Sequence, residues 1–179
     1  MNNTPPIPAA ELEIVLIEPE IPTNTGNIGR TAAATGCPLH VVHPIGFEMD
    51  EKALRRAGLD YWKHVDCREH DSWPAYLEQE SPKRAWLFST KGGRPYWEAD
   101  FAPGDHLIFG KESAGVDEKT RLAIIERYGP ESILTLPMVE KPGIRSLNLA
   151  TAVAIVAYEG LRQFNGVGKE SSSNGTTQG

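Results

Sequence analysis

The sequence predicts an α/β fold in which a parallel sheet is flanked by helices. Short continuous apolar runs, at 14–17, 85–90 and 106–109, alternate along the chain with segments of helical periodicity. A continuous apolar run of strand length suits a strand that is covered on both faces, as in a parallel sheet. The alternation of strands with helices favours the same architecture. With 179 residues the chain is long enough for one domain with a substantial core and too short for two ordinary ones.

The first half of the chain contains a regular series of expected elements. They are a strand at 14–17, a helix that opens at Thr25 or Asn27 and closes at Gly36, a strand at 39–42, and short helices at 50–57 and 71–80. Pro19 and Pro22 are expected to end the first strand, because proline cannot donate to a sheet ladder. Gly36 suits the left-handed residue after a helix, and Ser72 suits an N-cap.

The second half continues the alternation of strands and helices. The expected elements are strands at 85–90, 106–109 and 133–136, an amphipathic helix at 117–127, and a helix at 147–164. Apolar residues cover most of the circumference of the last helix, so it must be buried, either in the core or against a partner subunit. We expect Ser146 to be its N-cap, with Asn148 adding a polar side chain in the first turn.

Composition limits the class of protein and its surroundings. No apolar run approaches the roughly 18 residues that cross a bilayer, and residues 1–10 lack the basic and apolar regions of an export signal. Cys37 and Cys67 do not make a disulfide framework, which favours a cytoplasmic protein with reduced thiols. We expect residues 11–164 to form a single domain, between a flexible arm at 1–10 and a disordered tail at 165–179.

The charge balance bears on nucleic-acid binding. A formal net charge of −6 argues against a protein that coats nucleic acid without specificity. A local basic patch is compatible with that charge, because many basic residues fall in or beside predicted loops; the alternative is that they only solvate the surface. These residues are Arg30, Lys52, Arg55, Arg56, Lys63, Lys91, Arg94, Lys111, Lys141 and Arg145.

Three loops that follow predicted strands combine glycine with polar residues. They lie at 89–93, 110–115 and 137–148. In an open α/β sheet, ligands bind beyond the carboxyl ends of the strands. If the three strands are neighbours, their loops converge and the sequence predicts a ligand pocket there.

Several sharper motifs are absent. A phosphate-binding P-loop needs four residues between its glycines and then Lys-Ser or Lys-Thr, but five residues separate Gly104 from Gly110, and Lys111 precedes a glutamate. The turn at 26–29 lacks the third glycine of a dinucleotide fingerprint. The chain also has no serine in a Gly-x-Ser-x-Gly elbow, which weakens a hydrolase interpretation.

The histidines give no metal motif along the sequence. His40 and His43 stand three apart on a predicted strand, so their side chains point to opposite faces. Cys67 and His70 have no second pair of ligands near them in the sequence. Joint metal binding by either pair is therefore not expected.

Arg30 is a candidate for contact with an anion. It lies on the helix that opens at 24–29, where small residues let a ligand approach and the helix N-terminus favours negative charge. A guanidinium at this place could clamp a phosphate through two parallel hydrogen bonds. The alternative is an ordinary arginine on a helix surface.

Three ordered segments carry a family resemblance. They are PTNTGNIGR at 22–30, LIFGKESAG at 107–115, and LPM at 136–138 followed by RSLNL at 145–149. Together they resemble the motifs of the SpoU branch of the SPOUT class of RNA 2′-O-methyltransferases. RRAGLDYW at 55–62 narrows the resemblance to single-domain members that act on the wobble nucleotide of tRNA. It covers about residues 12–164, and its one departure is a longer segment at 140–144.

The resemblance implies a fold, a cofactor and an assembly. The sheet would carry a deep trefoil knot at its C-terminal end, an exception to the rule that chains do not thread their own loops. S-adenosylmethionine would sit in that knot, with no metal, and the protein would be a homodimer. The implied cofactor contacts are Phe88, Gly110, Leu136 and Ser146, with Met138 and Leu147 beside them.

The resemblance also implies an activity. The substrate would be the anticodon stem-loop of tRNA, methylated on the ribose of cytidine or uridine 34, and Arg30 would be the catalytic arginine. Asn24, Glu112, Arg145, Ser146 and Asn148 would shape the site, while Tyr158 would face the RNA or the dimer seam, or merely pack. Two alternatives stay open: a ribosomal RNA 2′-O-methyltransferase, and a knotted RNA-binding module without catalysis.

Overall fold

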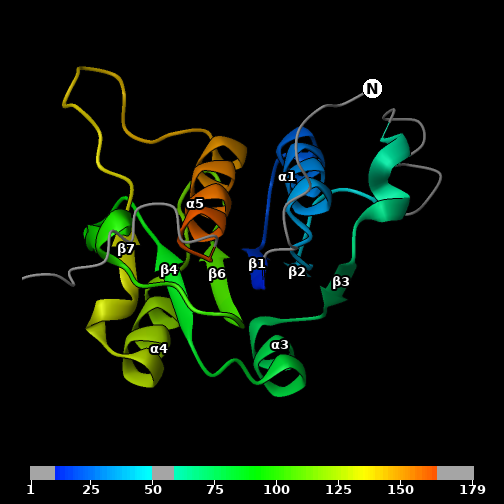
Figure 1. Ribbon diagram of the computed structural model, residues 1–179, viewed down its shortest axis with the longest axis horizontal. Helices are drawn as coiled ribbons and strands as arrows, with labels where there is room; N and C mark the ends of the chain where they lie inside the picture. Colours follow the sequence, from blue (N-terminus) through cyan, green and yellow to red (C-terminus); the bar gives the residue numbers. More distant parts are fainter. Residues whose placement is uncertain (1–10, 50–58, 165–179) are drawn as a thin grey trace, which may run out of the picture.

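A computed structural model describes residues 11–49 and 59–164 and shows the predicted parallel α/β sheet (Figure 1). Its seven strands are all parallel and lie in the order β3-β2-β1-β6-β4-β7-β5. The strands are β1 (Leu12–Ile17), β2 (Leu39–Val42), β3 (Cys67–His70), β4 (Ala85–Phe88), β5 (Arg94–Pro95), β6 (Asp105–Phe109) and β7 (Ile133–Thr135). The helices are α1 (Pro22–Thr35), α3 (Trp73–Glu80), α4 (Glu118–Tyr128) and α5 (Leu149–Phe164), with short 3₁₀ helices η1 (Asp60–His64), η2 (Tyr96–Glu98) and η3 (Pro130–Ser132).

Helices cover both faces of the sheet. On one face α1 and α5 pack beside each other and bury Ile28 and Val156 against the sheet. On the other face α3 and α4 bury Tyr76 and Ile124. Each face therefore has its own apolar cluster, and a central strand must supply both.

Strand β1 shows how one sequence serves both clusters. Leu12, Ile14 and Leu16 join the cluster under α1 and α5, whereas Val15 and Ile17 join the cluster under α3 and α4. Successive side chains of a strand point to opposite faces, so a continuous apolar run is what this position requires. Glu13 stands two positions before Val15, so its side chain points to the same face of the sheet, the one covered by α3.

The predicted strands are confirmed, with shifts at their ends. Residues 39–42 form β2 as expected, whereas β1 begins two residues before the expected start and β4 ends at Phe88. Two strands were not expected. β3 is an edge strand with polar side chains, and β5 has two residues, so neither shows an apolar run. The expected helix at 50–57 and both expected tails lie outside the described residues.

The start of α1 differs from the prediction. The helix begins at Pro22, about one turn before Thr25, with Ile21 as N-cap. Proline suits the first turn of a helix, because its φ is already helical and its missing N–H has no partner to lose. The expected end is confirmed, since Gly36 has a φ of 73° and its N–H donates to the Ala32 carbonyl.

The start of α5 also corrects the prediction. Asn148, and not Ser146, is its cap: the Asn148 Oδ1 accepts from the backbone N–H groups of Ala150 and Thr151 at 2.9 and 3.3 Å. Ser146 lies before the helix and is exposed. The expected N-cap Ser72 does cap α3, and Asp117, expected as the first residue of its helix, caps α4.

Within residues 11–49 and 59–164, one side of α5 is buried. Its buried residues are Val153, Val156, Ala157, Gly160 and Leu161. On the other side Tyr158 is 52% exposed, and Ile155 is half-buried. No helix in the described part of the chain is long and apolar enough to cross a membrane.

Candidate active site

A cavity of about 520 Å³ lies at the carboxyl ends of β4, β6 and β7. These strands are adjacent in the sheet, with β4 between β6 and β7. The three loops that leave them line the cavity, so the predicted convergence is confirmed. Gly92 and Gly93 of the first loop, and Pro137 and residues 139–144 of the third, do not line it. The lining includes Phe88, Ser89, Thr90, Lys91, Phe109, Gly110, Lys111, Glu112, Leu136, Met138, Arg145, Ser146, Leu147 and Asn148. A volume of this size suits a small organic cofactor.

Two stacked aromatic rings form part of the cavity wall. Phe88, at the end of β4, and Phe109, at the end of β6, have ring centroids 4.7 Å apart and planes 12° apart. Both rings are almost fully buried, and both residues line the cavity. The two rings form an apolar part of the cavity wall, against which a planar group can pack.

The loop after β6 turns so tightly that its first residue must be glycine. A Cβ on Gly110 would lie 2.3 Å from the carbonyl carbon of Gly115 and 2.4 Å from the Val116 nitrogen. The Gly115 N–H donates to the Lys111 carbonyl at 2.8 Å, and Gly115 has a φ of 71°. The loop is thus folded back on itself beside the cavity that it lines.

Glu112 in this loop caps helix α1. One carboxylate oxygen accepts from the Glu20 N–H at 2.8 Å, and the other accepts from the Ile21 N–H at 3.3 Å and from Asn24 Nδ2 at 3.0 Å. The N-cap Ile21 has no side-chain acceptor of its own. A carboxylate at this end satisfies free N–H donors and complements the helix dipole.

Asn24 links Glu112 to the third loop. While its amide nitrogen donates to Glu112, its Oδ1 accepts from Asn148 Nδ2 at 2.9 Å. Asn24 is 6% exposed. The Glu112–Asn24–Asn148 relay therefore ties the loop after β6, helix α1 and the start of α5 together at one edge of the cavity.

Two acidic residues before α1 hold the same loop. Lys111 pairs with Glu18 at 2.6 Å, and this partner raises the pKa of the lysine. Ser113 donates from its N–H and its Oγ to Glu20, both at 2.9 Å, and these bonds lower the pKa of Glu20. Lys111, one of the residues for which a basic patch was considered, is therefore paired within the protein.

Arg30 lies outside the cavity, on the exposed side of α1. Its guanidinium carbon is 4.5 Å from the centroid of the Tyr61 ring. The Tyr61 hydroxyl donates to the Gly26 carbonyl at 2.7 Å, and so the ring is fixed to the same helix. Arg30 is thus held over an aromatic face with its charge in solvent.

The glycines of α1 admit the chain's own side chains. A Cβ on Gly29 would lie 2.3 Å from Cζ3 of Trp62, and one on Gly26 would lie 3.2 Å from Leu59 Cδ1. The small residues of this helix therefore make room for η1 and its flank, where we had expected a ligand. In the sequence, Tyr61 and Trp62 stand out only as part of the RRAGLDYW pattern at 55–62.

Most of the predicted site residues meet at the cavity. Those that line it are Asn24, Phe88, Gly110, Glu112, Leu136, Met138, Arg145, Ser146, Leu147 and Asn148. Arg30 and Tyr158 do not line it. Arg121 of α4 does line it and was not predicted; its guanidinium donates to Ser89 Oγ at 3.3 Å. Nothing in the pattern of an amphipathic helix distinguishes that arginine from its exposed neighbours.

A ligand cavity built by the strand-end loops of a parallel sheet is the arrangement of α/β proteins that bind a ligand beyond the carboxyl ends of their strands. The chain belongs to the SpoU rRNA methylase family, whose model matches residues 11–158. The resemblance noted in the sequence is thereby confirmed.

Named relatives cover nearly the whole chain. A protein of Saccharophagus degradans named tRNA (cytidine(34)-2'-O)-methyltransferase is 44% identical over 157 residues, 88% of this chain and 98% of that protein. A solved structure described as "Structural insights into the 2-OH methylation of C/U34 on tRNA" is 47% identical, with a TM-score of 0.76, over 87% of this chain and 97% of that one. The SpoU methyltransferase AviRb of Streptomyces viridochromogenes, solved with the cofactor AdoMet, shares the fold: its TM-score is 0.68 at 23% identity, over 89% of this chain and 63% of that one.

Proposed function

We propose that this protein transfers a methyl group from S-adenosylmethionine to the ribose 2′-hydroxyl of nucleotide 34, cytidine or uridine, in tRNA. The observation that carries the proposal is the cavity at the ends of β4, β6 and β7, joined to the arginine-bearing helix α1 by the Glu112–Asn24–Asn148 relay. Relatives of matching length and more than two-fifths identity, named for this reaction, support the choice of substrate.

The cofactor would occupy the cavity. Phe88 offers an apolar face, and Gly110, which has no Cβ, lets the backbone of Gly115 and Val116 fold back beside the cavity. Leu136, Met138, Ser146 and Leu147 line the same space from the segment between β7 and α5. We propose that this segment forms the trefoil knot of the family. When bound, the cofactor supplies an electrophilic methyl on a sulfonium, so the transfer calls for no metal.

Arg30 would position the RNA. An arginine side chain stays protonated in proteins, so it acts through charge and hydrogen bonds, and serves poorly as a proton acceptor. Its exposed guanidinium can clamp a phosphate beside the reacting ribose, with the Tyr61 ring holding it in one plane. Fixed placement of the hydroxyl for in-line attack is itself a large part of such catalysis.

The exposed side of α5 supports a homodimer. Tyr158 and the half-buried Ile155 lie on the side of the helix that faces away from the sheet. A second copy would bury this side and complete the surface that meets the anticodon stem-loop. Sedimentation at twice the chain mass is the expected result.

The activity is tested with unmodified tRNA and labelled S-adenosylmethionine. We expect one methyl per tRNA, at the ribose of nucleotide 34, located by nuclease digestion and mass spectrometry. Ribosomal RNA from the same cells, offered in parallel, should remain unlabelled. Labelling of ribosomal RNA alone would replace the substrate, and cofactor binding without transfer to any RNA would favour a binding module.

A further inference from the structure

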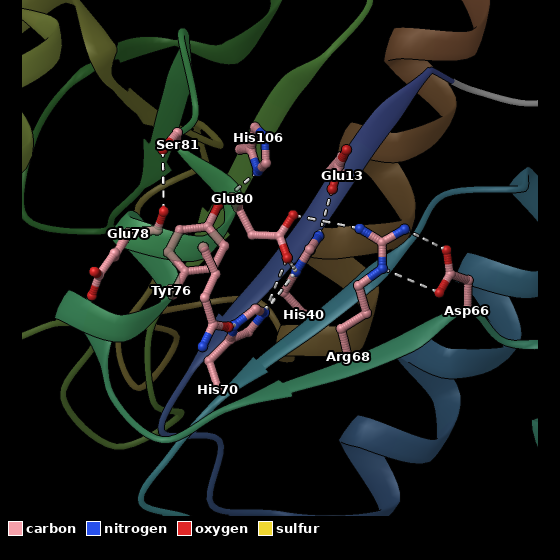
Figure 2. A network of polar contacts seen from close by, with 11 residues as sticks. Glu13, His40, Asp66, Arg68, His70, Tyr76, Glu78, Glu80, Ser81 and His106 are labelled. Carbon is pink, nitrogen blue, oxygen red and sulfur yellow. Dashed lines mark hydrogen bonds and ion pairs between the residues drawn. The ribbon is translucent and has the colours of Figure 1, made fainter.

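A cluster of buried histidines lies on the sheet face covered by α3, apart from the cavity (Figure 2). His40 comes from β2, His70 from β3 and His106 from β6, and their exposed fractions are 0%, 3% and 5%. Glu13 of β1 and Glu80 at the end of α3 border the cluster. The three histidines come from separate strands that only the sheet order brings together, so their spacing along the chain gives no sign of the cluster.

Three atoms of this cluster form a compact triangle. His40 Nδ1 lies 2.9 Å from His70 Nε2, and Glu80 Oε1 lies 3.8 and 3.9 Å from these two nitrogens. The circle through the three atoms has a radius of about 2.1 Å. Zinc binds histidine nitrogen at about 2.0–2.1 Å and carboxylate oxygen at about 2.0–2.2 Å. One ion near the centre would therefore reach all three atoms. Because two nitrogen ligands of a tetrahedral ion lie about 3.3–3.4 Å apart, the two ring nitrogens would separate by a few tenths of an ångström when the ion binds.

In each of the three side chains, the other polar atom has a hydrogen-bond partner of its own. The other ring nitrogen of His40 bonds Glu13 Oε2 at 2.5 Å, and that of His70 bonds Gln79 Oε1 at 2.7 Å. The second oxygen of Glu80 accepts from Arg68 at 3.4 Å. Histidines that bind metals almost always donate their other N–H to a carboxylate or carbonyl oxygen, and both histidines here face such an oxygen.

The third histidine belongs to a different set of contacts. His106 Nδ1 lies 2.6 Å from the Tyr76 hydroxyl, and burial raises the pKa of that phenol, so the hydroxyl donates and the ring nitrogen accepts. A site built on Glu13, His40 and His106 would have to use the Glu13–His40 bond that supports the first triangle. The first triangle is the one whose supporting bonds are complete.

We propose that His40, His70 and Glu80 form a binding site for one divalent ion of the zinc class. The site has two histidine ligands and one carboxylate, with a fourth position for water. The bound ion would link the edge strand β3 and its neighbour β2 to helix α3 and so stabilise this part of the sheet. Without the ion, the two facing ring nitrogens share a hydrogen; when the ion binds, this hydrogen leaves as a proton. The proposal does not rest on the methyltransferase activity.

The test uses the full chain, freed of any histidine tag and stripped with a chelator. Titration with Co²⁺ should give the intense visible absorption of a four-coordinate ion, saturating at one ion per chain, and Zn²⁺ should displace it. Zn²⁺ should also raise the melting temperature of the wild-type protein. Absence of the absorption band at one equivalent, with no rise in melting temperature, would overturn the proposal.

Variants locate the ion. His70→Gln and Glu80→Gln should each abolish the cobalt band, and Gln79→Leu should weaken binding about 10–100-fold by removing support from His70. His43→Gln is the matched control, because His43 follows the same strand as His40 but pairs with Glu69 at 2.7 Å. Cobalt binding that survives in His70→Gln, or is lost in His43→Gln, would show that the ion binds elsewhere. Circular dichroism of each variant verifies that it is folded.

Discussion

Single side chains with every polar atom engaged determine the geometry of the cavity edge. Asn24 is the clearest case, because its amide nitrogen donates to Glu112 and its oxygen accepts from Asn148. Glu112 stands 88 positions and Asn148 stands 124 positions after Asn24 in the sequence. An amide, with one donor end and one acceptor end, is the only side chain of this shape that can serve both neighbours.

Asn24→Asp is expected to destabilise the protein by on the order of 2 kcal/mol or more, because a buried carboxylate would face the Glu112 carboxylate. Urea unfolding measures the loss. Asn27→Asp on the exposed side of the same helix is the matched control and should have little effect. Equal stability of wild type and Asn24→Asp would contradict the relay.

Arg30→Ala is expected to lower methyl transfer at least about 100-fold while the affinity for S-adenosylhomocysteine stays near that of the wild type. The reason is that Arg30 lies outside the cavity, on the exposed side of α1. Transfer kinetics and calorimetric titration give the two quantities. Arg30→Lys keeps the charge but loses the planar fork of the guanidinium, so its rate of methyl transfer should lie between those of the wild type and Arg30→Ala. A parallel loss of cofactor affinity would show that the assigned role is wrong.

At the scale of elements, two ends of helices decide how the site is assembled. Helix α1 begins beside Glu112, and helix α5 begins directly after its cap Asn148, so both start at the cavity edge. Proteins commonly place ligand sites where helix N-termini meet strand ends. Here the helix caps are themselves members of the relay that shapes the cavity.

Asn148→Ala should lower the free energy of unfolding by about 0.5–2 kcal/mol, the usual cost of a lost N-cap. Its side chain accepts from two backbone N–H groups of α5 and donates to Asn24. Ser146→Ala is the control, because Ser146 is exposed and precedes the helix. If thermal denaturation showed the larger loss in Ser146→Ala, the assignment of the cap would be reversed.

Gly160→Ala should destabilise the contact between α5 and β1 by about 1–3 kcal/mol, despite the higher helix propensity of alanine. The added Cβ would lie 2.2 Å from Leu12 Cδ1, a fully buried side chain. Gly46→Ala, where no atom lies within 4 Å, is the matched control for denaturant unfolding. A stabilised Gly160→Ala protein would mean that Leu12 can move aside.

Sequence patterns predicted the central elements because burial on both faces leaves long apolar runs, as in β1 and β6. They missed β3 because an edge strand needs no such run; its sequence is Cys-Arg-Glu-His. They placed the start of α1 too late because Pro22 reads equally as the end of a strand and as the first residue of a helix. The three site loops were predicted from strand ends, whereas the Asn24–Asn148 bond spans 124 positions and depends on the folded chain.

At the scale of the whole molecule, the two sheet faces have different chemistry. The face under α1 and α5 is mostly apolar, whereas the face under α3 also contains the histidine cluster with Glu13 and Tyr76. Buried titratable groups make stability depend on pH. The cavity lies at the carboxyl ends of β4, β6 and β7, whereas the titratable cluster lies on the face under α3. The loss of stability in acid therefore arises away from the cavity.

Stability is expected to fall as the pH drops below neutral. Burial lowers the pKa of His106, so below about pH 6.5 the unfolded chain takes up a proton that the folded protein does not. The hydrogen bond from His40 lowers the pKa of Glu13, and so stability falls further below about pH 4.3. Both effects have the same sign: stability is present at higher pH and is lost in acid.

Urea unfolding with a chelator present, at several pH values between 7.5 and 5, measures the first effect. His106→Gln should flatten the decline, since glutamine can still accept from the Tyr76 hydroxyl but does not titrate. His64→Gln, an exposed histidine outside the cluster, is the control. An unchanged slope in His106→Gln would place the acid sensitivity on other groups.

The carboxylate of Glu112 meets α1 at its first turn, and Arg30 stands on the same helix, about 9 Å further along its axis from Asn24. A regular helix of this length behaves as a stiff rod. The loop after β6 contacts one end of this rod and Arg30 stands further along it, so a movement of the loop would carry the arginine with it. The distance between methyl donor and RNA acceptor would then stay constant without a hinge.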